Sequence, residues 1–416
     1  MRLFFLFFAL GVLPTFAANH YVRAGASGTG TDWANACADF TGSCAVASLV
    51  RGDAYYVANG TYAQRTWNTA TSGTLTIVIK KATVADHGTA TGWSDAYGNG
   101  QAVFTGAGTI ATSYWTFDGQ IGDYATKLPY GFMFHFSEGD TAMKVNVPSG
   151  TAFTFRYIDF DGRSASGNYN YTANTKGFEV WDGNDWTLSH CSIHGGESLM
   201  QGGGNNVLVE YSYLYNSRST ASAWHGNVFF VCCSTGGTFR YNRIWDYNDE
   251  GLFFTGYTTP PNNWKVYGNV FSGTGAEQNP RGIEIRQDYN YSGLEFYNNT
   301  FVNLSVGGLL NRTLETGNTC SGCIARNNLS YNAGNTLTGM TASSNTDDEI
   351  NRFVNLAASD FRLAAALPGE NLAVAFNLDL LGNTRGSEGT WDRGAFEFGG
   401  TSLKPQPPTG LTSVVR

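Results

Sequence analysis

The stretch Trp264-Lys-Val-Tyr-Gly-Asn-Val-Phe271 decides the fold, because its pattern returns 30 residues later (294 − 264) as Leu294-Glu-Phe-Tyr-Asn-Asn-Thr-Phe301. Each copy is a short strand of alternating apolar and polar residues, followed by a polar residue and, two positions later, an apolar one. Similar copies begin at Trp186, Val207, Thr238 and Cys323. A pattern that returns at this interval predicts a solenoid, in which each turn of the chain stacks on the one before.

The polar position of the repeat predicts a second regular feature. Along the chain it reads Cys191, Ser212, Asn242, Asn269, Asn299 and Asn328. Four successive asparagines at one place predict a ladder, in which each side-chain amide bonds the asparagine one coil away. Asparagine also tolerates the left-handed backbone of a tight turn, so separate turn asparagines are the alternative. The regular recurrence favours the ladder.

A second strand precedes each copy of the repeat. Its first residues lie 21, 28, 25, 31 and 26 residues apart by subtraction, and they are Lys176, Glu197, His225, Glu250, Arg281 and Gly307. Intervals of about 20–30 residues that carry two or three strands are typical of a solenoid coil. The composition agrees, because 52 glycines with only 14% charged residues suit short strands joined by tight turns. We predict an all-β protein built as a single-stranded parallel β-helix.

Segments at both ends of the chain resemble a known superfamily. Val57-Ala-Asn-Gly-Thr-Tyr62 is similar to a first-coil turn of that superfamily. The segments Asp360-Phe-Arg-Leu363, Gly382-Asn-Thr-Arg385 and Asp392-Arg-Gly-Ala-Phe-Glu397 look like the closing segments of many exported bacterial members. Over essentially its whole mature length, the chain resembles the pectin-lyase-like superfamily of right-handed parallel β-helices. The resemblance implies the right-handed fold and leaves the reaction open.

The chain divides into four predicted parts. Residues 1–17 have the pattern of a signal peptide, with Arg2 before an apolar run and small residues at the cleavage site. We expect the parallel β-helix over 18–340, a C-terminal coil or capping region over 341–398 and a flexible tail over 399–416. An exported chain without another apolar span predicts a secreted protein, extracellular or periplasmic, with no membrane contact after cleavage. We expect it to be a monomer.

Charge and cysteines narrow the partners and the compartment. A net charge of −8 disfavours nucleic acid, which needs a basic surface. Export permits disulfides, so we expect Cys37–Cys44 to pair and regard Cys320–Cys323 as a second candidate. Cys191 falls in an apolar strand and is expected in the core. The adjacent Cys232 and Cys233 either form a vicinal disulfide or are two free thiols.

Side-chain alternation places a candidate site on the second strand. Apolar residues two and four positions after its start, such as Phe178 and Val180, are expected to face inward. The position directly after the start would then face solvent, and along the chain it reads Gly177, Ser198, Gly226, Gly251, Gly282 and Gly308. Such a column would form a shallow trough for an extended ligand. Alternatively, each coil needs glycine there to turn into the strand.

Charged and aromatic residues flank the predicted trough. The start column holds Lys176, Glu197, His225, Glu250 and Arg281, with Trp224 and Asp249 just before it and Glu179, Trp181, Phe253, Glu284 and Arg286 beyond it. Coils stack about 4.8 Å apart, so neighbours in a column are within reach of one another. Flat aromatic rings suit the apolar faces of pyranoses. The column therefore predicts an enzyme that acts on a polysaccharide.

One candidate reaction is β-elimination by a lyase, which needs a base and neutralisation of a uronate carboxylate. His225 is the residue that titrates near neutral pH, and Arg281, Arg286 and Lys176 would supply positive charge. The acidic residues Glu197, Asp249, Glu250 and Glu284 could hold Ca²⁺, which is therefore a candidate cofactor.

The other candidate reaction is glycoside hydrolysis, for which Glu250 or Asp249 with Glu284 or Glu197 would supply the two carboxylates. The segment Arg281-Gly-Ile-Glu-Ile-Arg286 resembles a Glu-x-Ile-Arg strand of alginate and chondroitin lyases, and His225-Gly226 resembles the His-Gly of polygalacturonases. The remaining motifs of both families are missing. We favour the lyase because positive and negative groups alternate in the column. A non-catalytic carbohydrate-binding or adhesin solenoid is the third hypothesis.

Overall fold

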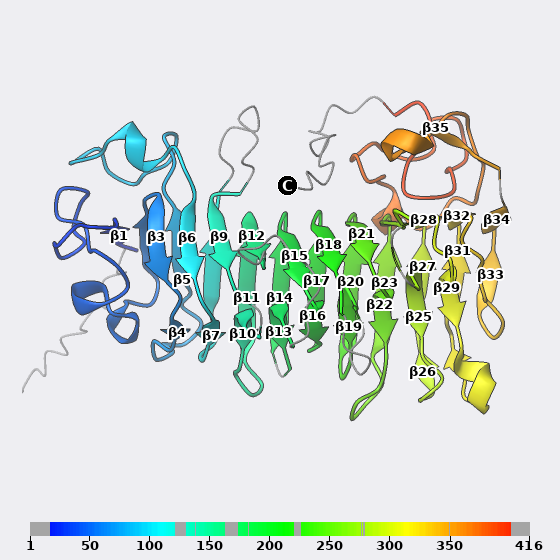
Figure 1. Cartoon of the computed structure of the whole chain (residues 1–416), viewed down its shortest axis with the longest axis horizontal. Coiled ribbons are helices and arrows are strands. Elements are labelled where there is room, and N and C mark those ends of the chain that lie inside the picture. The colour runs from blue at the N-terminus through cyan, green and yellow to red at the C-terminus, as the bar shows by residue number, and fades with distance from the viewer. Residues whose placement is uncertain are drawn as a thin grey trace, which may run out of the picture.

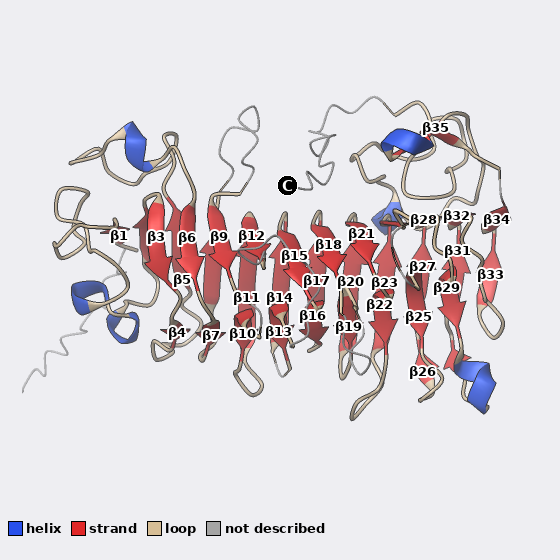
Figure 2. Ribbon diagram, viewed as in Figure 1, coloured by secondary structure: helices blue, strands red, loops and turns tan. Residues whose placement is uncertain are grey.

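The chain winds into a right-handed parallel β-helix, as predicted (Figures 1 and 2). The computed structural model describes residues 17–120, 130–137, 139–162, 174–181, 183–219, 226–275, 277, 279–348 and 350–400. Most of the predicted signal peptide (1–16) and most of the predicted tail (401–416) lie outside these residues. Each full coil contributes one strand to each of three long parallel sheets, which we name A, B and C.

The three sheets differ in length. Sheet A has 12 strands: β1 (Asn19–Val22), β2 (Ala54–Val57), β5 (Ile77–Lys81), β8 (Trp115–Asp118), β11 (Thr151–Arg156), β14 (Asn184–Ser189), β17 (Val207–Glu210), β20 (Thr235–Arg240), β23 (Asn262–Tyr267), β27 (Glu295–Tyr297), β31 (Ile324–Arg326) and β33 (Thr341–Ser343). Sheet B has 11 strands: β3 (Gly60–Ala63), β6 (Ala102–Thr105), β9 (Phe132–His135), β12 (Ile158–Asp161), β15 (Ser192–Gly196), β18 (Tyr213–Ser217), β21 (Arg243–Tyr247), β24 (Val270–Ser272), β28 (Thr300–Val302), β32 (Leu329–Tyr331) and β34 (Thr346–Asp348). Sheet C has nine strands: β4 (Thr66–Trp67), β7 (Gly108–Ile110), β10 (Thr141–Val145), β13 (Lys176–Val180), β16 (Ser198–Gly202), β19 (Phe229–Val231), β22 (Glu250–Phe254), β25 (Arg281–Ile285) and β29 (Gly307–Asn311).

The remaining described elements are short. Two further strand pairs are β26 (Tyr291–Ser292) with β30 (Cys320–Ser321), and the antiparallel β35 (Phe353–Asn355) with β36 (Asp360–Leu363). The helical turns are 3-10 turns: η1 (Gly42–Cys44), η2 (Val46–Ser48), η3 (Asp95–Tyr97), η5 (Thr313–Thr316), η6 (Leu356–Ala358) and η7 (Val374–Phe376). The described part of the chain contains no helix long and apolar enough to cross a membrane.

Aromatic rings fill the interior of the coil. Phe117 and Phe155 stack on successive coils with ring centroids 5.4 Å apart, and Phe155 meets Phe178 edge-on at 5.0 Å. These three side chains are at most 1% exposed. Burying each large apolar side chain contributes about 1.5–3 kcal/mol, so the stacked rings stabilise every coil against its neighbours.

The asparagine ladder is confirmed. Asn242 Nδ2 donates to Asn269 Oδ1 at 3.1 Å, and the same bond links Asn269 to Asn299 (3.0 Å) and Asn299 to Asn328 (3.1 Å). The ladder continues to Asn345, which accepts from Asn328 Nδ2 at 2.9 Å. The left-handed backbone belongs to the residue before each ladder asparagine, as at Asn298 (φ 51°), and not to the ladder residue itself.

The predicted outward trough of glycines is wrong, because Gly177, Gly251, Gly282 and Gly308 face the interior and Gly226 lies outside the column. A Cβ on Gly251 would lie 2.6 Å from Cδ1 of Phe271, and one on Gly282 would lie 2.4 Å from Cδ1 of Phe301. Pairing between β22 and β25 skips the glycine and resumes at Leu252. The strand bends there, so the glycine and the residue after it both face inward. Glycine is needed for the close approach to the core.

The C-terminal part of the chain folds back over sheet B. Coil strands continue to β34, inside the range that the sequence assigned to the capping region, and residues 350–400 then stand above the last coils (Figure 1). Two disulfides are present, Cys37–Cys44 and Cys320–Cys323, as expected. Cys191 is a buried free thiol, and Cys232 and Cys233 are also free.

Candidate active site

The outer face of sheet C brings some of the predicted site residues into one column. Glu250 pairs with Arg281, and Phe253 pairs with Glu284, as neighbours on successive strands. Lys176 pairs with Ser198 and not with Glu197, so the predicted alignment is wrong by one residue there. Glu197 lies in the corner before β16, where its backbone N–H donates to Thr175 at 2.9 Å.

The coil between these residues also differs from the predicted alignment. Phe229 pairs with Met200 on one side and with Leu252 on the other. Asn227, two residues before Phe229, is therefore level with Ser198 on one side and with Glu250 on the other. The sequence alignment had placed His225 at this position. His225 and Trp224 themselves lie outside the described residues.

An arginine cluster occupies the end of the face formed by β22, β25 and β29. We define it as Asp249, Glu250, Arg281, Glu284 and Arg312. The Arg281 guanidinium lies 2.5 Å from the carboxylate of Asp249. It also lies 2.6 Å from the carboxylate of Glu284 and 3.7 Å from that of Glu250. Arg312 reaches Glu284 from the next coil at 3.2 Å. Burial alone would lower the pKa of Arg281, but the surrounding carboxylates outweigh it and raise the pKa, so this guanidinium stays charged.

A pocket of about 300 Å³ opens beside the arginine cluster. It is lined by Arg281, Val306, Leu310, Arg312, Glu315 and Thr336. The Arg312 side chain is one-third exposed, and it bonds Glu315 at 2.9 and 3.0 Å. A cavity with one apolar wall and one charged wall has the chemistry to hold a sugar ring.

A lysine cluster lies further along the same face, toward the N-terminal coils. We define it as Lys144, Lys176 and Glu179, carried by β10 and β13. Lys144 Nζ lies 3.1 Å from one Glu179 oxygen, and Lys176 Nζ lies 3.7 Å from the other. The side chain of Lys176 is 5% exposed and that of Lys144 is 41% exposed. The lysine cluster therefore pairs a buried amine with an accessible one.

The pKa of Lys176 is lowered. Its main cause is burial, which penalises the charged ammonium, and the nearby charge of Lys144 acts in the same direction. The carboxylates of Glu179 and Glu197 oppose the shift without cancelling it. A lysine in this state gives up its proton more readily than an exposed one, which is what a catalytic base requires.

Aromatic side chains lie along the face between the two clusters. Trp181 Nε1 donates to Glu179 at 2.5 Å, and its ring lies 6.1 Å from that of Tyr257. Phe253 is 3% exposed, because Phe230 packs against it at 5.7 Å and the Arg286 guanidinium covers it at 5.6 Å. Trp181 and Phe230 are half-buried and Tyr257 is exposed, so these three aromatic residues have surface to offer a ligand.

Sequence reasoning missed Lys144 and Tyr257. Lys144 stands level with Glu179, one strand earlier, in a coil whose repeat is too irregular to align from sequence. Tyr257 lies in the connecting segment after β22, and this segment is not part of the sequence repeat. Only the three-dimensional fold brings it to Trp181.

The residues proposed for Ca²⁺ do not fit that ion. In the described ranges, no three His, Cys, Asp or Glu side chains are grouped so that they could hold a metal ion. The carboxylates of Asp249 and Glu284 are engaged by the Arg281 guanidinium, which supplies the positive charge that a cation would otherwise bring.

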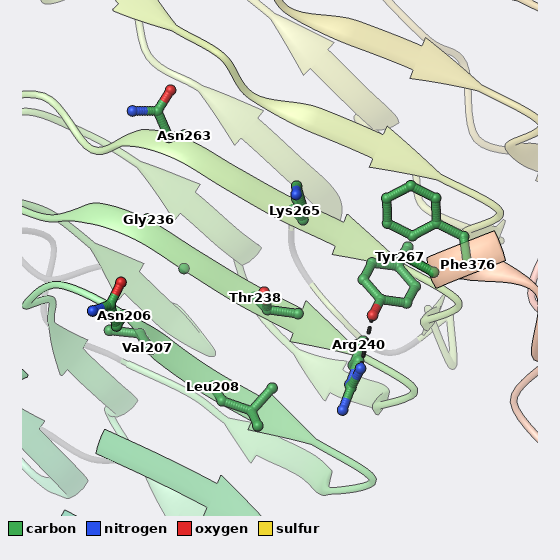
Figure 3. A pocket seen from close by; sticks show the side chains of 12 residues that line it. Asn206, Val207, Leu208, Gly236, Thr238, Arg240, Asn263, Lys265, Tyr267 and Phe376 are labelled. Carbon is green, nitrogen blue, oxygen red and sulfur yellow. Dashed lines mark hydrogen bonds between the residues drawn. The ribbon is translucent and has the colours of Figure 1, made fainter. Parts of the chain in front are cut away.

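A larger groove, of about 540 Å³, lies on the outer face of sheet A, away from the predicted residues (Figure 3). Strands β17, β20 and β23 form its floor, and Phe376 of η7 forms one wall. Arg240 is held there by Tyr267 at 2.9 Å and by Glu210 at 2.6 Å. None of the residues predicted for the site lines this groove.

Comparison with known proteins returned no matching family model and no similar curated sequence. Several solved structures are similar. Pectate lyase Pel9A is 16% identical with a TM-score of 0.46, over 92% of this chain and 97% of that one. The PL6 family alginate lyase AlyGC is 13% identical with a TM-score of 0.37, over 85% and 54%. The periplasmic alginate epimerase AlgG is 13% identical with a TM-score of 0.31, over 78% and 66%. None of these similarities identifies the reaction, which has to be inferred from the chain's own residues.

Proposed function

We propose that the protein is a secreted polysaccharide lyase, which binds an extended uronate-containing chain along the outer face of sheet C. The supporting observation is the placement of charged and aromatic side chains on strands of one sheet, and on the segments that directly follow them, from β10 to β29. Stacked strands lie about 4.8 Å apart, so β13 and β22 are roughly 14 Å apart. A chain lying parallel to the helix axis would contact both clusters at once.

The lysine cluster supports elimination chemistry. In this reaction a base takes the proton next to the uronate carboxylate. A carbon–carbon double bond then forms as the bond to the leaving oxygen breaks, and that oxygen takes up a proton from solvent. Lys176, with its lowered pKa, is our candidate for the base. Lys144 is accessible and positively charged, and it would pair with the substrate carboxylate and stabilise the charge that develops there. Glu179 holds both amines in place.

The arginine cluster supports substrate binding rather than hydrolysis. A hydrolase needs one protonated and one ionised carboxylate. The Arg281 guanidinium contacts the carboxylates of both Asp249 and Glu284 at 2.5–2.6 Å, so one cation engages both members of the pair that hydrolysis would use. We therefore assign the neighbouring pocket to sugar units further along the chain, and regard hydrolysis as the competing outcome of the test.

The test is an activity assay with uronate and neutral polysaccharides. Elimination gives an unsaturated product with new ultraviolet absorbance, whereas hydrolysis gives reducing ends without that absorbance. We expect Lys176→Ala to lower the elimination rate by about 100-fold or more, because general-base catalysis contributes at least that much. Lys176→Arg keeps the positive charge but cannot release a proton near neutral pH, so it should be equally inactive.

The pH profile gives a second readout. Activity should rise with pH as Lys176 loses its proton, and the midpoint should fall below that of an ordinary lysine. Lys265→Arg, at an exposed position on sheet A, is the matched control and should leave the rate unchanged. Full elimination activity in Lys176→Ala would show that Lys176 is not the base. Products with new reducing ends but without new absorbance would show that the protein is a hydrolase and not a lyase.

A further inference from the structure

Tyr257 is an aromatic side chain left in solvent. It exposes 72% of its surface, although the structure offers apolar rings to pack against. The segment that carries it follows β22 and folds back along the coil, so that its ring lies 6.1 Å from that of Trp181 at the end of β13. Strands β16 and β19 lie between these two strands in sheet C. The contact therefore spans three coil steps.

The segment that carries Tyr257 is anchored on both sides. Thr255 donates to Asp288 at 2.8 Å, and Thr258 donates to the Cys233 thiol at 3.5 Å. A Cβ on Gly256 would lie 2.1 Å from the ring of Tyr289, so the backbone is pressed against that ring. The exposure of Tyr257 is thus imposed by a well-held backbone.

Trp181 connects this aromatic pair to the lysine cluster. Its Nε1–H donates to Glu179 Oε1 at 2.5 Å, and the same carboxylate contacts Lys144 and Lys176. The two rings are inclined by 51°, so they present two faces at an angle and do not stack on each other. Since mutual packing would have buried both rings, the open arrangement points to a ligand.

We infer that Trp181 and Tyr257 form a sugar-binding subsite, which takes the apolar face of one pyranose ring beside the lysine cluster. Aromatic faces suit the C–H face of a pyranose, while carboxylate and ammonium groups at the rim bind its hydroxyl and carboxylate groups. Lys144 reaches the rim of the subsite and selects for a uronate over a neutral sugar. This choice of ligand rests on the proposed function.

The test measures binding separately from turnover. Oligogalacturonate, oligoalginate and cello-oligosaccharide are titrated by calorimetry into the wild-type protein and into Tyr257→Ala, Tyr257→Phe and Val374→Ala. We expect Tyr257→Ala to weaken binding of the preferred oligosaccharide by about 10-fold and to raise KM more than it lowers kcat. Tyr257→Phe keeps the ring and should restore most of the affinity. Val374, which is 79% exposed on η7, serves as the matched control.

The outcomes separate this subsite from the proposed reaction. If Tyr257→Ala binds more weakly but the wild-type protein shows no elimination activity, the subsite is supported and the proposed lyase activity is contradicted. Elimination activity with unchanged KM and affinity in Tyr257→Ala would overturn the subsite alone. If none of the three oligosaccharides binds the wild-type protein, both proposals fail.

Discussion

Lys81 shows how strongly the position of one residue controls its chemistry. It ends β5 with 1% of its surface exposed, and its ammonium donates to the carbonyls of Ala82 and Tyr97. Burial lowers the pKa of Lys81 to about 7. Near neutral pH the folded chain therefore holds this proton weakly, whereas the unfolded chain holds it firmly.

This difference predicts a pH-dependent stability. An unfolded lysine titrates near 10.4, so between about pH 7 and pH 10 the unfolded chain binds more protons than the folded one. The free energy of unfolding should therefore rise with pH across this window. Each pKa unit corresponds to 1.36 kcal/mol, so Lys81 contributes a change of up to about 4 kcal/mol.

Lys81→Met removes the titrating group and provides the measurement. Urea unfolding of the wild-type and variant proteins at pH 6 and pH 10 gives the difference between their free energies of unfolding. Between pH 6 and pH 10 the free energy of unfolding of the wild-type protein should rise relative to that of Lys81→Met. The difference between the wild-type protein and Lys265→Met, which changes an exposed lysine, should stay the same at both pH values. An equal difference at both pH values would contradict the buried-lysine interpretation.

At the scale of the element, the asparagine ladder is the most regular device in the coil. Asn269 is fully buried, and its amide donates to Phe239 O at 2.9 Å and to Asn299 Oδ1 at 3.0 Å. Its own Oδ1 accepts from the backbone N–H of Asn242 at 2.9 Å. One side chain thus satisfies buried polar groups on three coils.

Asn269→Leu should be strongly destabilising. The substitution leaves buried donors and acceptors on the adjoining coils without partners, and each such group costs about 1–3 kcal/mol. We expect the free energy of unfolding in urea to fall by about 3 kcal/mol or more. Asn290→Leu is the matched control, because Asn290 Oδ1 accepts from the backbone N–H of Thr319 on the next coil at 2.9 Å in an exposed pair. Similar losses for both variants would show that buried bonding does not decide the ladder's contribution.

The sequence was sufficient to predict the coil and its ladder, because both depend on a pattern that is repeated many times. Asn242, Asn269, Asn299 and Asn328 support one another in any alignment of the repeats. Where a corner changes length, the alignment has no such support. Glu197 was placed one position away for this reason, since it occupies the corner before β16.

The candidate site was predicted less completely, because its contacts are not periodic. Glu250 and Arg281 follow the repeat, and their pairing could be predicted. The contact between Trp181 and Tyr257 depends on the path of one connecting segment, and no sequence spacing encodes it. Gly251, Gly282 and Gly308 were placed in one column correctly, but their side was wrong because the strand bends at the glycine.

At the scale of the whole molecule, the two halves of sheet B have different outer faces. In the N-terminal half this face carries charged groups such as Asp161 and His194, which pair on successive strands. In the C-terminal half it carries the buried apolar residues Val270, Val302 and Leu329. The segment after residue 350 packs on these apolar residues (Figure 1).

A polar group at Val302 should therefore loosen the C-terminal region without unwinding the coil. Val302→Ser places a hydroxyl in a fully buried apolar contact, which costs about 2 kcal/mol. Amide hydrogen exchange should speed up by about 10-fold or more in residues 353–396 and stay unchanged in β13. Val103→Ser changes the same type of residue on the outer face of sheet B in β6, where the side chain is only half-buried, and should leave both regions unaffected. If β13 exchanged faster together with the C-terminal region in Val302→Ser, the two parts would unfold as one unit, and the C-terminal region would be a structural part of the coil rather than a cover on it.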